Sequence, residues 1–165
     1  MLTWKYARIL IYYRIWVVIM SDSKDSLFIM LVELYKRVVG NEIEIPAYSK
    51  ETRTNLIADL TDEYKFELII NRKGHRNKNI FSLVFLSSKY RDNKLMRLDF
   101  TGQSHRGIET PHVHIFDSKH DFGKNAGQLK DIVGIEVKDY NKALEWFLEE
   151  NHVNMHETII TKNLV

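Results

Sequence analysis

Histidines and charged residues that can carry chemistry gather in the middle of the chain. His112 and His114 are two residues apart, and Arg97 and Asp99 show the same spacing earlier in the sequence. Side chains two apart on a β-strand project from the same face, so each pair is expected to share a face if its segment is a strand. If the two strands are neighbours, a carboxylate, a guanidinium and two imidazoles meet on one surface.

Three kinds of chemistry fit this group of four. Two histidines can act as general base and general acid near neutral pH while Arg97 stabilises a phosphorane-like charge, which predicts metal-free RNA cleavage. The same groups also bind RNA without cutting it. His-x-His beside a carboxylate is also typical of a metal site, but the spacing fixes no fourth ligand. We favour RNA binding over catalysis, with a metal-independent ribonuclease of toxin type as the alternative, and we expect no metal or other cofactor.

The predicted RNA-binding surface extends beyond this group. A basic segment at 72–79 separates two predicted strands, and loop residues after Phe100 can reach the same face. Lysine and arginine side chains on such loops displace the counterions that condense on a phosphate backbone. The predicted RNA-binding residues are Arg72, Lys73, His75, Arg76, Lys78, Arg97, His105, Arg106, His112, His114 and Phe116. For the alternative, a ribonuclease, the predicted catalytic residues are His112, His114, Asp99 and His105.

The distribution of charge is compatible with an anionic partner. The 165-residue chain has a net charge of only +2, but residues 65–130 carry 13 basic and 6 acidic residues and five of the seven histidines. Residues 22–64 and 131–165 are acidic. A basic centre of this kind predicts a site for a polyanion. The alternative is a solvated sheet face whose charges pair with the acidic segments.

The strands and helices that must position these residues follow from periodicity. Apolar and polar residues alternate in three segments and a fourth is more uniformly apolar, which predicts the strands 65–71, 80–87, 95–100 and 112–116. Helical spacing of apolar residues predicts helices over 24–39 and 140–151. Residues 43–45 are expected to be extended, and 47–63 fit either a helical turn or a strand. The predicted fold is α+β, an antiparallel sheet of about four or more strands covered on one face by helices.

The first 21 residues differ from the rest in composition. They hold three basic residues, no acidic ones and several aromatic rings, and their longest uncharged run, 15–21, is far shorter than the ~20 residues of a membrane span. They are either an upstream extension of the reading frame or an aromatic-basic arm that packs in a homodimer. A single domain is expected over 22–165. The absence of cysteine excludes a disulfide scaffold and a thiol nucleophile, and together with the lack of a membrane segment it predicts a cytoplasmic protein.

The segment with the histidines also resembles a family. Leu98-Asp-Phe-Thr-Gly102, His105 and Pro111-His-Val-His-Ile-Phe116 are similar to the pattern LRLDxxGxxH followed by pHxHIY of an uncharacterised family of small bacterial and prophage proteins. The resemblance covers about residues 24–152, and Arg106-Gly107 replaces a longer Asn-Pro-Asp-Gly turn of the family. It implies no activity.

A second resemblance is to small phage-encoded inhibitors of host defence. The chain is small and free of cysteine, and it is rich in residues with AT-rich codons. With the predicted RNA-binding face, it is similar to anti-CRISPR proteins that act with bound RNA. This resemblance implies two partners, an RNA and a CRISPR-type effector complex of the host.

Overall fold

The structure is a computed structural model that describes residues 25–74 and 80–163. Its strands are β1 (Lys36–Val38), β2 (Glu42–Ile45), β3 (Glu51–Ala58), β4 (Thr61–Asn71), β5 (Phe81–Ser87), β6 (Lys94–Thr101), β7 (His112–Ile115), β8 (Gly127–Gln128), β9 (Val153–Asn154) and β10 (Ile159–Lys162). Its helices are α2 (Ser26–Glu33), α3 (Leu129–Val133) and α4 (Tyr140–Glu150), with a 3-10 turn, η1, at Arg91–Asn93. The predicted arm over 1–21 lies outside the described residues.

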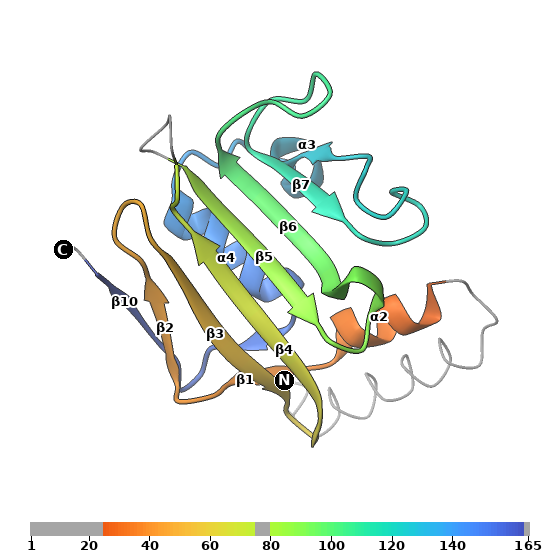
Figure 1. Cartoon of the computed structure of the whole chain (residues 1–165), viewed down its shortest axis with the longest axis vertical. Coiled ribbons are helices and arrows are strands. Elements are labelled where there is room, and N and C mark those ends of the chain that lie inside the picture. The colour runs from red at the N-terminus through yellow and green to blue at the C-terminus, as the bar shows by residue number, and fades with distance from the viewer. Residues whose placement is uncertain (1–24, 75–79, 164–165) are drawn as a thin grey trace.

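Most of the strands form one large sheet (Figure 1). The eight strands lie in the order β8-β7-β6-β5-β4-β3-β1-β9, and neighbours are antiparallel except for β1 and β9, which are parallel. A separate pair joins β10 to β2 in parallel. The α+β class and the antiparallel pairing of the four predicted strands are therefore confirmed, as β4 to β7.

The predicted helix over 24–39 is wrong in its second half. The helix ends at Glu33, because Leu34 adopts an extended ψ of 130°. Residues 36–38 then form β1, in which two buried residues flank exposed Arg37 and pair with β3. The ambiguous segment 47–63 contains β3 and the start of β4, and in β3 the buried residues Thr54, Leu56 and Ala58 alternate with more exposed ones. Tertiary pairing decides both cases, since the local apolar spacing of 24–39 is also compatible with a helix.

Helix α4 lies against one face of the sheet, where it contacts β5 and β6, and it is seen behind β5 in Figure 1. Asp139 caps it by accepting a hydrogen bond from the amide of Asn141 at 3.0 Å. Its buried Phe147 ring contacts the ring of Phe85, with centroids 6.4 Å apart. Phe85 is paired with Met96 on β6, so the side chains at the alternating positions of these strands point to the opposite face.

A fully buried lysine joins the ends of two helices. The Nζ of Lys36 donates hydrogen bonds to the carbonyls of Val32 at 2.8 Å, Leu34 at 2.6 Å and Asn151 at 2.8 Å. Helix C-terminal carbonyls lack partners within the helix, so this one ammonium satisfies groups from the ends of α2 and α4. Burial holds the pKa of Lys36 well below its usual value, although the charge of Glu33 opposes the shift.

Among the helices of the described residues, none has both the length and the apolar character that a membrane crossing requires.

Candidate functional site

The registers of β5, β6 and β7 bring the sequence-predicted group together. Asp99 lies opposite His112, and Arg97 lies opposite His114. On the other side of β6, Asp99 faces Ser82 of β5. All five side chains are on the sheet face opposite α4. We call this face, which carries Ser82, Arg97, Asp99, His112 and His114, the pocket face. The prediction that the acid, the arginine and the two histidines share one face is confirmed.

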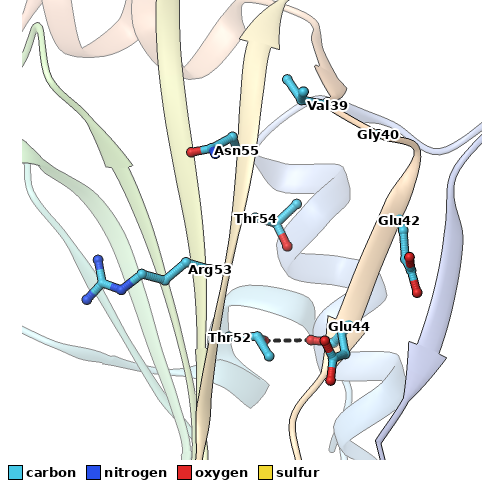
Figure 2. Close-up of a pocket in the computed structure, with 8 residues that line it drawn as sticks. All are labelled: Val39, Gly40, Glu42, Glu44, Thr52, Arg53, Thr54 and Asn55. Carbon is cyan, nitrogen blue, oxygen red and sulfur yellow. Dashed lines mark hydrogen bonds between the residues drawn. The ribbon is translucent and has the colours of Figure 1, made fainter.

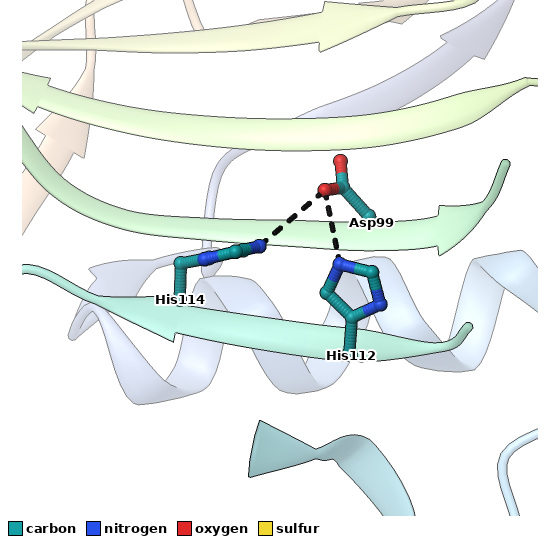
Figure 3. A group of neighbouring side chains, drawn as sticks. All are labelled: Asp99, His112 and His114. Carbon is teal, nitrogen blue, oxygen red and sulfur yellow. Dashed lines mark ion pairs between the residues drawn. The ribbon is translucent and has the colours of Figure 1, made fainter. Parts of the chain in front are cut away.

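Both histidine rings approach the same carboxylate oxygen (Figure 3). The Nε2 atom of His112 is 3.3 Å from Oδ2 of Asp99, and the Nε2 atom of His114 is 3.7 Å from the same oxygen. His112 is 1% exposed and His114 is 5% exposed, so they are buried residues of the sheet rather than open stacking platforms. We call these three residues the Asp99–histidine group.

Backbone carbonyls fix the orientation of both rings. The Nδ1 atom of His114 is 2.7 Å from the carbonyl oxygen of Gly123, and that of His112 is 3.3 Å from the carbonyl oxygen of Glu109. A carbonyl can only accept, so each Nδ1 carries the proton. In a neutral ring the lone pair is then on Nε2, which faces Asp99. Burial lowers the pKa of His114, against smaller opposing effects of the Gly123 carbonyl and Asp99.

The second oxygen of Asp99 is bound to arginine. Nε of Arg97 donates to Oδ1 of Asp99 at 2.8 Å. The Arg97 side chain remains 46% exposed, whereas that of Asp99 is 11% exposed. The carboxylate is therefore held between a solvent-facing guanidinium on one oxygen and two buried imidazoles on the other.

These residues lie at one side of a pocket of about 450 Å³. His105 also reaches it, and its ring centroid is 4.9 Å from that of His114. The pocket is mostly polar, and its lining includes residues that sequence reasoning missed: Asn71, Ser82, Thr101, Gln103 and Ser104. Asn71 and Ser82 could have been predicted from strand pairing, because antiparallel neighbours place Asn71, Ser82 and Asp99 in one row across the sheet.

Of the other predicted RNA-binding residues on loops, the structure brings Lys73 to this pocket. Lys73 lines it and pairs with Glu51 at 3.2 Å. Arg72 instead stacks on Tyr48, with its guanidinium carbon 3.8 Å from the ring centroid, and donates to the carbonyl of Pro46 at 3.2 Å. Arg106 is exposed in the tight turn between His105 and Ile108. His75, Arg76 and Lys78 lie outside the described residues.

Phe116 does not lie open on the surface. It is half-buried, and its ring packs directly against Gly123, whose carbonyl holds His114. A Cβ atom at Gly123 would be 2.6 Å from Cε1 of Phe116. The contact therefore supports the loop that orients His114 and occupies part of the ring.

This close contact predicts that Gly123→Ala lowers the stability of the protein more than Gly134→Ala does. Gly123 has a φ of +84°, and Gly134 has a φ of +79° with nothing within 4 Å of an added Cβ. Both substitutions impose a left-handed conformation that costs about 1–2 kcal/mol. The clash with Phe116 should add about 1–3 kcal/mol to the first alone. Urea denaturation of the two variants measures the difference, and equal losses would contradict this role of Gly123.

A second pocket, of about 460 Å³, lies between β2 and β3 (Figure 2). Its two acids are engaged: Glu42 accepts from the hydroxyl of Thr161 at 2.8 Å, and Glu44 accepts from the amide of Asn163 at 3.0 Å. Figure 2 shows the Arg53 side chain pointing away from both. We therefore take the pocket beside the Asp99–histidine group as the candidate functional site.

Comparisons with known proteins place the chain in a family. A search of the curated proteins and a search of the solved structures each find no match. The model of a family of unknown function (DUF6978) matches residues 23–153, a span that includes every residue of the candidate site. The expectation of an uncharacterised family is thus confirmed, and the chain belongs to this family of unknown function.

Proposed function

We propose that this protein binds single-stranded RNA at the pocket face, with one nucleotide entering the pocket. The observation that carries the proposal is the placement of Arg97 and Lys73 on a polar pocket of about 450 Å³. Pockets of this size suit small ligands, and RNA-binding proteins read single strands whose bases and 2′-hydroxyls are accessible. A phosphate at the pocket mouth would meet both cations.

The polar lining of the pocket favours RNA over a ligand that is recognised by its negative charge alone. Ser82, Thr101 and Gln103 supply hydroxyl and amide groups that can hydrogen-bond a ribose or a base edge. His105 adds a half-buried ring above the Asp99–histidine group. We propose that RNA binds the sheet face opposite α4. This placement agrees with the expected fold, in which helices cover only the other face. The resemblance to anti-CRISPR proteins extends the proposal to a host effector complex reached together with this RNA.

Local acids compete with RNA for the cations. Glu51 pairs with Lys73 and also with Arg53 at 3.1 Å. The hydrogen bond from Lys73, and to a smaller extent that from Arg53, lowers the pKa of Glu51. The carboxylate is therefore charged in the neutral range. Removing that charge should free Lys73 for a phosphate. On this proposal Glu51 limits the affinity for RNA.

The proposal predicts opposite effects of two kinds of variant on binding of a labelled single-stranded RNA. Lys73→Glu with Arg106→Glu should weaken binding by about 10-fold or more and reduce the salt slope by about 2, since each phosphate contact contributes about one unit. Glu51→Gln should strengthen binding. Fluorescence anisotropy at several salt concentrations measures both effects.

The matched control reverses two exposed lysines elsewhere, Lys138→Glu with Lys142→Glu, and changes the net charge equally. An equal loss of affinity in this control, or no RNA binding by the wild type, would contradict the proposal. The same RNA separates a binder from the alternative, a metal-independent ribonuclease. RNA that stays intact with EDTA present supports a binder, and cleavage by the wild type under that condition supports the ribonuclease.

A further inference from the structure

We propose that Asp99, His112 and His114 form a binding site for a divalent transition-metal ion of the zinc type. Each residue offers one ligand atom, and the three atoms lie within 4.8 Å of one another. The inference goes beyond RNA binding and does not depend on it, because it rests on the three ligand atoms and their hydrogen bonds rather than on contacts with a phosphate.

Ring orientation is the first argument. Metal-binding histidines usually donate their other ring N–H to a carbonyl or a carboxylate, which fixes the tautomer and aims the lone pair at the ion. His112 and His114 both do so, through Glu109 and Gly123. Arg97 does the same for the carboxylate by binding Oδ1 and leaving Oδ2 toward the rings. Each of the three ligands therefore has an outer partner already in place.

The balance of protons and charges is the second argument. With neutral rings, two Nε2 lone pairs face a carboxylate oxygen, which is a repulsive arrangement. Among the described residues the buried Nε2 of His112 has no hydrogen-bond partner. A cation between the three atoms satisfies the lone pairs and the carboxylate together.

The distances suit a zinc-type ion. A tetrahedral ion about 2.0–2.1 Å from each ligand atom holds those atoms about 3.3 Å apart. Oδ2 of Asp99 is 3.3 Å from one Nε2 atom and 3.7 Å from the other, and all three ligand atoms lie within 4.8 Å of one another, so the side chains would draw together around a bound ion. Two imidazoles with one carboxylate suit zinc and its neighbours, whereas Mg²⁺ prefers oxygen ligands. The remaining coordination position is expected to face the pocket.

Calorimetric titration of the EDTA-treated, desalted full chain with ZnCl₂, without RNA, tests the site. The wild type should bind one Zn²⁺ per chain and should not bind Mg²⁺. Asp99→Asn and His114→Gln should weaken Zn²⁺ affinity by more than about 100-fold, the upper end of the loss expected for an outer partner alone. His120→Gln is the matched control, because His120 also contacts a carboxylate, Asp117 at 2.6 Å, but lies outside the group.

A second measurement does not depend on how well the variants fold. Histidine-ring NMR of the wild type should show Zn²⁺-induced shifts of Nε2 in two rings, with both Nδ1 protons retained. Absence of Zn²⁺ binding by the folded wild type, or Zn²⁺ binding without these two shifts, would overturn the site. Because these experiments contain no RNA, their failure is distinguishable from failure of the RNA-binding proposal.

Discussion

Replacing Lys36 by alanine should lower the free energy of unfolding by about 3–5 kcal/mol. The substitution leaves the buried carbonyls of Leu34 and Asn151 and the part-buried carbonyl of Val32 without their shared donor. Each unsatisfied buried polar group costs about 1–3 kcal/mol. The variant also loses the contact of the ammonium with the Phe66 ring, whose centroid is 4.8 Å away. Urea denaturation measures the loss, and Lys142→Ala on the exposed side of α4 should change stability by less than about 0.5 kcal/mol.

The pH dependence of this effect has a definite sign. Because burial lowers the pKa of Lys36 in the folded state, the unfolded chain holds this proton to higher pH. Stability from this group therefore rises as the pH increases from the lowered folded pKa toward the unfolded pKa. Lys36→Met fills the space but cannot titrate. The free energy of unfolding of the wild type should therefore rise relative to that of Lys36→Met from neutral to alkaline pH. A constant difference would contradict a shifted pKa.

Truncating Phe147 to alanine should destabilise the protein by a similar amount, about 3–5 kcal/mol. The side chain is fully buried, and it packs on Phe85 behind the strands that carry the pocket. Loss of a buried aromatic ring removes both its transfer free energy and its packing contacts. Thermal and urea denaturation measure the effect.

Two variants of α4 serve as controls for Phe147→Ala. Glu145→Ala is on the exposed side of the same helix and should be nearly neutral. Phe147→Leu keeps much of the volume and should cost less than alanine. If all three substitutions had similar effects, the helix itself rather than the contact with the sheet would be the source of the loss.

The strands around the site could be predicted from the sequence because their signal is local. Alternation in β6 and β7 was enough to place Arg97 with Asp99 and His112 with His114 on one face. The length of α2 could not be predicted in this way. Its apolar spacing continues past Glu33, and only pairing with β3 and β9, which are distant in sequence, makes residues 36–38 a strand.

The orientation of the histidines depended on neighbouring loops rather than on the alternation within the strands. Spacing did not indicate that the carbonyls of Glu109 and Gly123 would hold the two Nδ1 atoms, since both belong to loops without a periodic pattern. The sequence therefore favoured an open, solvated face. In the structure, carbonyls of two loops contact the rings of His112 and His114, and of Arg97, Asp99 and the two histidines only Arg97 is substantially exposed.

The contact between Lys36 and Asn151 has a consequence for the order in which the chain is completed during translation. Strands β3 to β7 follow one another along the chain and pair as consecutive neighbours, so they can assemble as they emerge from the ribosome. Strands β1 and β2 cannot complete their contacts at that stage. Lys36 of β1 needs the Asn151 carbonyl, β1 needs β9, and β2 needs β10. The edge of the sheet at β1 thus closes after β3 to β7 have paired, and it stays exposed to chaperones and to other nascent chains until residues 151–162 have been made.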